Sequence, residues 1–212
     1  MKNKKEDIKA IIFDIGGVLV RASLLKKPSG GHIHGVHEHI AKKLNVTIDQ
    51  YFDSIDTAYT DSVVGKKTKE ESLRIMAKNL ETTPEKLEKL YIKFYNIKFN
   101  KELIKKAKQL KKQGYKIGVL SDQWQVSREI QFPKKLEKIF PIHVISCDVG
   151  IRKPNPKIYK LVLKKLKIPT KNVLFIDNQK WNLIPAKKLG MKTILFKDNA
   201  RTFEDLKKLG IK

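Results

Sequence analysis

Cysteine is almost absent from this chain, because Cys147 is the only one among 212 residues. A single cysteine cannot form a disulfide within the chain or build a cysteine-based metal site. Long apolar runs are missing as well, and the lysine-rich start is not followed by the apolar stretch of a secretion signal. We therefore expect a soluble protein with no membrane span that works in a reducing compartment, the cytoplasm.

Acidic residues are also scarce, since 22 Asp and Glu face 46 Lys and Arg and leave a formal net charge of +24. Such a charge attracts polyanions, so nucleic acid has to be considered as a partner. The lysines, however, are spread along every predicted helix instead of being gathered with aromatic residues in one tract. Arginine, which is better suited to contacts with base edges, is much rarer than lysine. We do not expect nucleic acid to be a specific partner.

Apolar runs and helical patterns alternate over most of the chain. Buried strands are predicted at 10–13, 116–121, 142–146, 172–177 and 192–196, and helices at 101–114, 127–138, 156–166 and 182–189. This alternation predicts an α/β fold in which helices cover both faces of a parallel sheet. Between 22 and 97, a predicted loop at 22–35 precedes helical signals only, including capping boxes at Thr47 and Thr68 and a helix start at Thr83. We expect an all-helical insertion there.

The most informative stretch is KAIIFDIGGVLVR at 9–21, where a buried strand ends at Asp14 and two glycines follow shortly. A carboxylate at the carboxyl end of a parallel strand lies at the edge of the sheet where ligands bind. On this stretch alone, Asp14 can equally well begin an ordinary turn. Two later strands end in the same way, KIGVLSD at Ser121 and Asp122 and NVLFID at Asp177. These side chains are therefore expected to converge.

Two converging carboxylates repel each other unless a cation lies between them. A hard divalent ion with oxygen ligands, Mg²⁺ above all, suits such a pair. The segment IRKPNPKIY places Lys153 directly before a helix that prolines open. A lysine in that position can neutralise the charge of a bound anion, although a single lysine in so basic a chain is a weak signal when taken alone.

In this order and spacing, the four segments resemble the four motifs of the haloacid dehalogenase-like (HAD) hydrolase superfamily. The segments DVGIRKPNPKIY and FIDNQKWNLIPAKKLGM are most similar to its alpha-glucose-1-phosphate phosphatase-like subgroup. The resemblance implies a Rossmann-like, doubly wound core formed by residues 1–21 and 98–212, with residues 22–97 inserted as a small helical cap. It also implies a metal-dependent phosphatase whose substrate is a small phosphorylated metabolite, such as a sugar phosphate.

The resemblance further implies a role for each motif residue. Asp14 is the nucleophile, which forms an aspartyl-phosphate, and Lys153 stabilises the charge on the phosphate. The hydroxyl of Ser121 and the backbone N–H of Asp122 bind phosphate oxygens. The implied ligands of Mg²⁺ are Asp14, the backbone carbonyl of Gly16, and Asp177.

Two positions depart from the family pattern. Gly16 stands where most of these phosphatases carry a second aspartate as general acid and base, a loss that typically costs about 10²–10⁴ in rate. The glucose-1-phosphate phosphatase-like subgroup resembles this form with glycine. Asn178 stands where a second aspartate of the last motif is usual, which weakens the hold on a metal. Both departures keep open a third reading, a catalytically weak phosphate-binding protein.

The dehalogenases of the superfamily are the alternative enzymes. They too lack the second aspartate of the first motif, and Trp181 resembles a tryptophan in their last motif. Arg21 lies where a residue that binds halide or carboxylate is expected. The dehalogenases, however, carry serine at the position of Asp177 and work without metal, so Asp177 favours phosphate chemistry.

A histidine cluster occupies GGHIHGVHEH, where four of the five histidines of the chain lie within a few residues of one another: His32, His34, His37 and His39. Imidazoles this close can bind Zn²⁺ or a similar ion. No cysteine and no second acidic cluster supports such a site, so we favour a polar lid whose histidines contact substrate or water. An imidazole of the cap, from His34 or His37, can also supply the proton transfers that Gly16 cannot.

Overall fold

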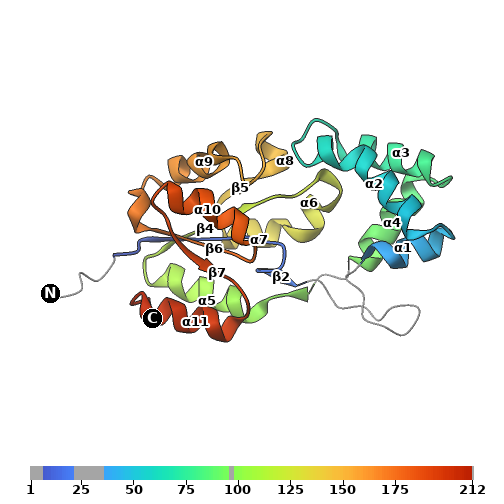
Figure 1. Ribbon diagram of the computed structural model, residues 1–212. Helices are drawn as coiled ribbons and strands as arrows, with labels where there is room; N and C mark the ends of the chain where they lie inside the picture. Colours follow the sequence, from blue (N-terminus) through green and yellow to red (C-terminus); the bar gives the residue numbers. More distant parts are fainter. Residues whose placement is uncertain (1–6, 22–35, 96–97, 212) are drawn as a thin grey trace.

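A five-stranded sheet lies at the centre of the larger part of the molecule in the computed structural model, which describes residues 7–21, 36–95 and 98–211 (Figure 1). Every neighbouring pair of its strands is parallel. The strand order is β5 (Ile142–Ile145), β4 (Lys116–Ser121), β1 (Ala10–Phe13), β6 (Val173–Asp177) and β7 (Lys192–Leu195). The predicted α/β fold with a parallel sheet is confirmed.

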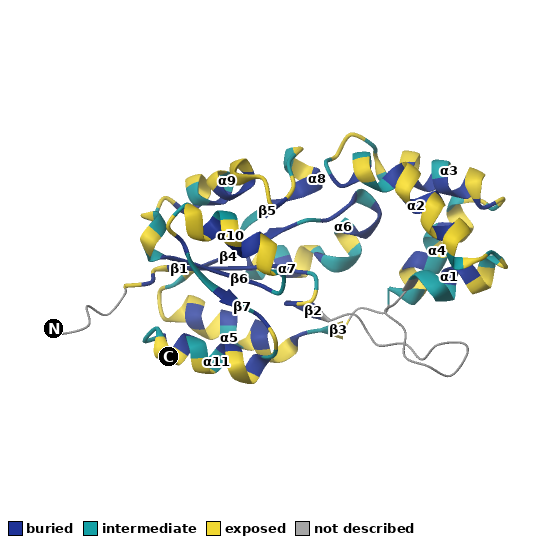
Figure 2. Ribbon diagram, in the orientation of Figure 1, coloured by how far each residue is buried: buried dark blue, intermediate teal, exposed yellow. Residues whose placement is uncertain are grey.

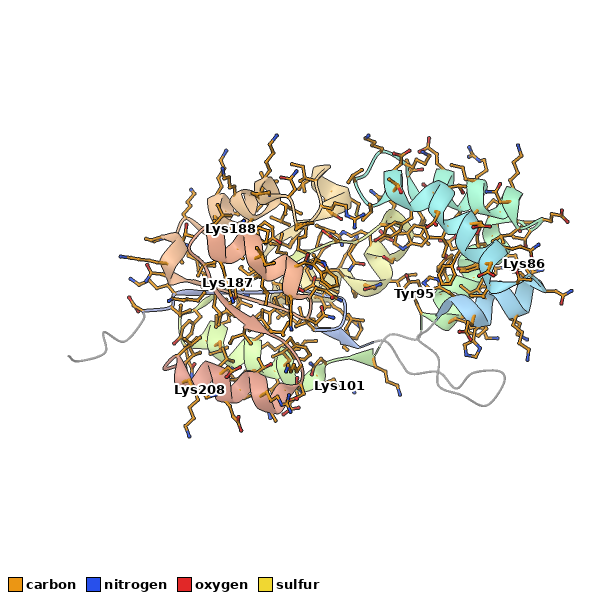
Figure 3. The ribbon with its side chains drawn as sticks, in the orientation of Figure 1. Lys86, Tyr95, Lys101, Lys187, Lys188 and Lys208 are labelled. Atoms are coloured by element: carbon orange, nitrogen blue, oxygen red, sulfur yellow. The ribbon has the colours of Figure 1, made fainter. Side chains whose placement is uncertain are left out.

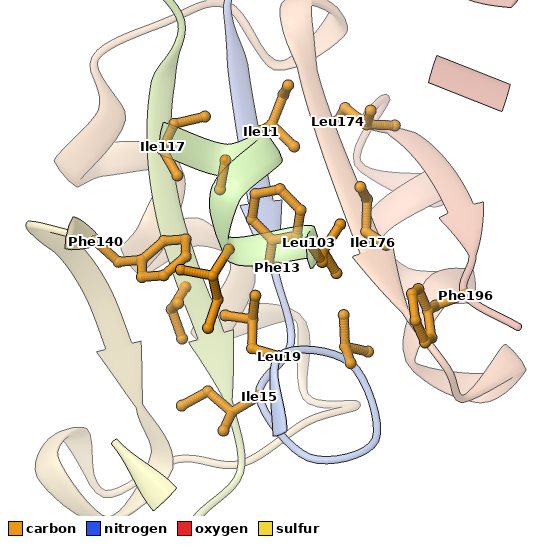
Figure 4. Close-up of a cluster of buried hydrophobic side chains, with 14 of the residues drawn as sticks. Ile11, Phe13, Ile15, Leu19, Leu103, Ile117, Phe140, Leu174, Ile176 and Phe196 are labelled. Carbon is orange, nitrogen blue, oxygen red and sulfur yellow. The ribbon is translucent and has the colours of Figure 1, made fainter. Parts of the chain in front are cut away.

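Helices cover both faces of this sheet (Figure 1). One face carries α9 (Pro156–Leu166) and α10 (Lys180–Lys188), and the opposite face carries α5 (Lys101–Lys112) and α11 (Asn199–Lys208). Because successive side chains of a strand point to opposite faces, Ile12 packs with residues of α9 while Phe13 joins the cluster that includes residues of α5 and α11. Figure 4 shows Phe13 among the side chains of this second cluster. A sheet buried on both faces explains the continuous apolar runs.

Four further helices form the smaller part of the molecule: α1 (Val36–Leu44), α2 (Ile48–Ser62), α3 (Lys69–Asn79) and α4 (Pro84–Phe94). The predicted capping boxes at Thr47 and Thr68 are present, and the Thr83 side chain caps α4 with Pro84 in its first turn. Each helix buries one stripe of its surface (Figure 2). Trp124 and Val126 of the larger part belong to the same hydrophobic cluster as these helices, so the two parts share packed surface. The predicted boundaries between core and cap, between residues 21 and 22 and between residues 97 and 98, stay a prediction.

Several elements differ from the expectation. The single helix predicted at 127–138 is wrong: α6 (Gln125–Gln131) ends before Pro133 and α7 (Lys134–Ile139) begins after it, because proline lacks the N–H that a continuous helix needs. The antiparallel pair of β2 (Val20–Arg21) and β3 (Lys98–Phe99) was not predicted. It joins the point where the chain leaves the sheet domain to the point where it returns. The short α8 (Ser146–Val149), the 3₁₀ turn Thr170–Asn172 and α11 were not predicted either.

Lysine side chains point outward over both parts of the molecule (Figure 3). The labelled examples lie on four different helices, namely Lys86 on α4, Lys101 on α5, Lys187 and Lys188 on α10, and Lys208 on α11. Among the described residues, no helix combines the length and the apolar content that crossing a membrane requires. The expectation that nucleic acid is not a specific partner stays a prediction.

Candidate active site

The ends of three adjacent strands bring the predicted residues together. β1 lies between β4 and β6 in the sheet, so the residues at their carboxyl ends meet at one edge. Asp14 follows β1, Ser121 ends β4 and Asp177 ends β6. All three are buried, with exposed fractions of 6%, 1% and 0%. The predicted convergence of these residues is present in the structure.

Lys153 reaches the same point from the loop before α9. Its ammonium Nζ lies 3.0 Å from Asp14 Oδ1 and 2.7 Å from Asp177 Oδ2. The backbone N–H of Lys153 donates a hydrogen bond of 2.9 Å to Asp122 Oδ1. Downstream, Asn155 caps α9 and Pro156 occupies the first turn of that helix, where proline is favoured. The loop is thus held on both sides of the lysine.

Negative charge exceeds positive charge at this edge, because three carboxylates (Asp14, Asp122 and Asp177) face two cations, Lys153 and Arg152. Burial raises the pKa of Asp14, and Lys153 opposes that shift. Burial by itself lowers the pKa of Lys153, but the three carboxylates outweigh it and raise that pKa, so the lysine is charged at neutral pH. An excess of buried carboxylate charge favours the binding of a further cation.

Oxygen atoms that a metal could use are present at this edge, and they differ in how many hydrogen bonds they already accept. Both carboxylate oxygens of Asp177 are engaged: Oδ1 accepts from the Gln179 N–H at 2.7 Å, while Oδ2 accepts from Lys153 Nζ and, at 3.1 Å, from Asn182 Nδ2. Two other buried oxygens lack a hydrogen-bond donor, Asn178 Oδ1 and Asp14 Oδ1. The Asp14 oxygen is ion-paired with Lys153 without hydrogen-bond geometry.

This donor set fits Mg²⁺, which binds carboxylate, carbonyl and amide oxygens and keeps several waters. Among the described residues, no group of three or more His, Cys, Asp and Glu gathers in a way that would hold a metal. A metal here must therefore depend on backbone or amide oxygens in addition to carboxylates.

A cavity of about 270 Å³ opens onto these groups, and we name it the catalytic cavity. Five of the six predicted site residues line it, whereas Asp177 is fully buried and is not part of the lining. Its described lining consists of Asp14, Gly16, Ser121, Asp122, Arg152, Lys153, Pro154, Asn178, Gln179, Trp181 and Asn182. Sequence reasoning missed Arg152, Gln179 and Asn182, because nothing in their spacing marks them apart from neighbouring polar residues.

The two glycines after Asp14 play different roles. Gly17 has a φ of +77°, and a Cβ there would lie 2.3 Å from Asn178 Nδ2, so this position requires glycine. Gly16 does not have positive φ, and the nearest atom to a Cβ at Gly16 is Gln131 Oε1 at 4.0 Å. The site therefore has room for a side chain at Gly16.

Only part of the histidine cluster can be placed. His32, His34 and the side chain of Arg21 lie outside the described residues. His37 packs against the rings of Tyr51 and Phe52 at 5.6 and 5.5 Å between centroids, and His39 stacks on Phe94 at 5.3 Å. These two histidines thus have aromatic neighbours, and the role of the whole cluster stays a prediction.

Comparisons with known proteins agree with this geometry. A family model described as haloacid dehalogenase-like hydrolase matches residues 8–190. Bifunctional epoxide hydrolase 2 of Rattus norvegicus is 36% identical over 115 residues, which cover 52% of this chain and 21% of that protein. Glyceraldehyde 3-phosphate phosphatase of Pyrococcus furiosus is 32% identical over 95 residues, which cover 42% of this chain and 38% of that protein. The match thus spans about a fifth to two fifths of the length of these relatives.

A solved structure shares the fold over almost the whole chain. It is a HAD family enzyme of Bacteroides thetaiotaomicron in complex with magnesium and inorganic phosphate. The TM-score is 0.70 at 19% sequence identity, and the superposition covers 92% of this chain and 99% of the other. At that identity the likeness establishes the common fold.

The buried lysine yields a prediction on stability. Lys153→Met leaves Asp14 and Asp177 without their cation, so in metal-free buffer at pH 7 the free energy of unfolding should fall by about 3–5 kcal/mol. The loss should be smaller at pH 5. Without the lysine the pKa of Asp14 lies further above its unfolded value, and protonation of the folded state then relieves the repulsion.

Urea unfolding of wild type and variant at both pH values measures this effect. Lys165→Met is the matched control, because the Lys165 ammonium contacts only the backbone carbonyl of His143 at an exposed position. A loss below about 1 kcal/mol for Lys153→Met, or one that grows as the pH falls, would contradict the account.

Proposed function

Because this chain belongs to the haloacid dehalogenase-like hydrolases, we propose that it is a magnesium-dependent phosphatase that hydrolyses a small phosphomonoester. The observation that carries the proposal is the position of Asp14. This buried carboxylate lines the catalytic cavity together with the ammonium of Lys153 and the hydroxyl of Ser121. A nucleophile, a cation and a hydroxyl donor around one small cavity are what transfer of a phosphoryl group requires.

Asp14 attacks phosphorus in the proposed reaction. A bond forms between a carboxylate oxygen of Asp14 and phosphorus, the bond to the ester oxygen breaks, and the alcohol leaves with a proton. Water then attacks phosphorus, which releases inorganic phosphate and restores the carboxylate. Lys153 has two effects: its charge opposes the protonation of Asp14, and it offsets the negative charge of the phosphate oxygens.

Two neighbouring side chains position these groups. The Asp122 carboxylate accepts from the backbone N–H of Lys153 and so fixes the loop that carries the ammonium. Gln123 Nε2 donates to Ser121 Oγ at 3.2 Å, which holds the Ser121 hydroxyl where we propose that it binds a phosphate oxygen. We also propose that the backbone N–H of Asp122 binds the phosphate.

The proposed metal ligands are Asp14, the carbonyl of Gly16, and Asp177. The unpartnered Oδ1 of Asn178 supports adding that residue to the set, since both oxygens of Asp177 already accept hydrogen bonds. When bound, Mg²⁺ offsets the charge of the carboxylates and of the phosphate. Magnesium and phosphate in the related Bacteroides structure support this assignment.

A proton donor for the leaving alcohol is missing at Gly16. His37 is a candidate, because it lines a cavity that also reaches Gly16 and its Nδ1 has no hydrogen-bond partner. Burial lowers the pKa of His37, so its imidazole is mainly neutral at pH 7. It can accept a proton from the water that attacks the aspartyl-phosphate, and the protonated imidazole can then supply that proton to the leaving alcohol of the next turnover.

A dehalogenase is the second candidate function, and the position of Trp181 in the catalytic cavity favours it. The buried carboxylate of Asp177 favours the phosphatase instead. Within the phosphatases, we propose the glucose-1-phosphate phosphatase-like subgroup, and we propose that residues 22–97 form the cap. Detectable turnover of a phosphomonoester would separate both enzymes from a weak phosphate-binding protein.

The nucleophile is tested by Asp14→Asn. We expect turnover of phosphomonoesters to fall by about 10³-fold or more, because the amide keeps the shape of the side chain but cannot attack phosphorus. Binding of vanadate, a phosphate mimic, should remain measurable by calorimetry. Asp205→Asn on the exposed face of α11 serves as the control and should keep full activity. An Asp14→Asn enzyme with near wild-type turnover would exclude the assignment.

The metal is tested by chelation and by Asn178→Ala. We expect exhaustive chelation to abolish phosphatase activity and Mg²⁺ to restore it. Asn178→Ala should raise the Mg²⁺ concentration needed for half-maximal activity by about tenfold or more, whereas Asn79→Ala in the cap should leave it unchanged. Activity that survives chelation would point to the metal-free dehalogenase reading, and an unaltered Mg²⁺ requirement would remove Asn178 from the ligands.

The missing acid is tested by Gly16→Asp. We expect a higher turnover number, by about tenfold or more, with little change in stability because the Cβ at Gly16 has open space. Gly17→Asp is the matched comparison and should be strongly destabilised, since φ at Gly17 is +77° and the added Cβ would lie 2.3 Å from Asn178 Nδ2. Turnover that does not rise in a folded Gly16→Asp enzyme would show that proton transfer does not limit the rate.

A further inference from the structure

A second cavity of about 410 Å³ adjoins the catalytic cavity. Gly16 and Asp122 line both cavities, so the second cavity meets the catalytic cavity beside the position proposed for the phosphate. The second cavity is lined by Phe52, Ile55 and Tyr59 of α2 and by Trp124, which precedes α6. We name it the leaving-group cavity.

Positive charge is absent from the described lining of the leaving-group cavity. Lysine and arginine make up 46 of the 212 residues of this chain, yet none of the described residues around this space is a lysine or an arginine. Asp56 and Asp122 supply the charged groups there. A second phosphate or a carboxylate on the substrate would meet these two carboxylates within the cavity, which is unfavourable in a partly desolvated space. The described cation that acts on Tyr59 and Asp122 from outside this lining is Arg152, which lines the adjoining catalytic cavity.

Aromatic rings and uncharged polar groups make up most of the remaining lining. The Tyr59 and Trp124 rings lie 5.7 Å apart, and the His37 and Phe52 rings lie 5.5 Å apart, measured between centroids. Such surfaces stack with aromatic rings and with the apolar faces of sugars.

The polar part of the lining consists of amides and a hydroxyl. Ser127 Oγ donates to Gln123 Oε1 at 2.9 Å, and Gln123 in turn donates to Ser121 in the catalytic cavity. Gln131 points its Oε1 toward Gly16. Amide and hydroxyl groups can pair with neutral hydroxyls of a substrate without any net charge.

We infer that this enzyme hydrolyses phosphate monoesters of uncharged, ring-bearing alcohols and rejects esters that carry a second anionic group. The inference rests on the proposed phosphatase function and adds the substrate class. Bisphosphates and phosphorylated carboxylic acids are excluded by the lining. A single phosphate on an aromatic or sugar ring fits it.

Four esters test the inference: benzyl phosphate, 4-carboxybenzyl phosphate, glucose 1-phosphate and butyl phosphate. The methylene of the benzyl esters keeps their leaving oxygens nearly equal in reactivity, so a difference between them reports the carboxylate. We expect kcat/KM for benzyl phosphate to exceed that for the carboxylated ester by about tenfold or more. At least one of the two neutral ring esters, benzyl phosphate or glucose 1-phosphate, should have a higher kcat/KM than butyl phosphate. The ratio of kcat/KM between these two ring esters tells whether the cavity prefers an aromatic ring or a sugar.

Equal or higher kcat/KM for the carboxylated ester would overturn the inference while leaving the phosphatase function intact. Equal kcat/KM values for butyl phosphate and both neutral ring esters would overturn the inference as well. If none of the four esters is hydrolysed in the presence of Mg²⁺, the phosphatase proposal fails and this inference fails with it.

A pair of variants at Phe52 tests whether the leaving-group cavity causes the selectivity between benzyl and 4-carboxybenzyl phosphate. Phe52 is 44% exposed at the cavity wall, so Phe52→Lys introduces a cation without disturbing the buried packing. We expect this variant to narrow the ratio between benzyl and 4-carboxybenzyl phosphate by about fivefold or more. Phe52→Leu, which changes size but not charge, should keep the ratio within about twofold. A ratio that Phe52→Lys leaves unchanged would contradict the inference.

Discussion

The ammonium of Lys153, held between the carboxylates of Asp14 and Asp177, is the interaction on which the rest of this site depends. Burying three charges is unfavourable unless each is paired, and here the sheet supplies the pairing: β1 and β6 are neighbours, so their terminal carboxylates lie side by side. The loop before α9 brings the lysine to them, and Asp122 holds that loop. A shift of any of these elements would leave a buried charge unpaired. The same arrangement keeps the carboxylate of Asp14, the proposed nucleophile, at the wall of a cavity.

Charge is distributed in opposite ways on the surface and at the site. Lysines over both parts of the molecule give a formal net charge of +24, which attracts phosphorylated compounds over a distance that salt limits. The buried edge of the sheet instead carries more carboxylates than cations, and the described lining of the leaving-group cavity carries two aspartates without a cation. Surface charge can therefore draw in many phosphate esters, whereas the cavities accept those that balance the local charge. The metal that we propose at Asp14 and the neutral leaving group that we infer both rest on this contrast.

Sequence alone was sufficient for the parallel sheet and for the meeting of Asp14, Ser121 and Asp177, because the carboxyl ends of parallel strands lie at one edge of the sheet. The place of Lys153 at this edge was expected from the resemblance of its segment to a family motif. Sequence alone could not reveal β2 and β3, since two residues are too short to show a pattern. It also predicted one helix across Pro133, where the structure has the two helices α6 and α7. The different needs of Gly16 and Gly17 appear only in their φ angles and in the distance to Asn178. Likewise, helical spacing predicts that α2 has an apolar face. It does not tell that Phe52, Ile55 and Tyr59 line one cavity together with Trp124.

The central claim is that the carboxylate of Asp14 bonds to phosphorus during turnover. The most direct measurement is an acid quench of the enzyme in steady state with a phosphomonoester and Mg²⁺, followed by protease digestion and mass spectrometry of the peptide that contains Asp14. The account predicts that a fraction of this peptide carries one phosphoryl group on Asp14, and that the fraction disappears when the substrate is exhausted. Active turnover with no phosphoryl group on Asp14, or with the group on another residue, would contradict it.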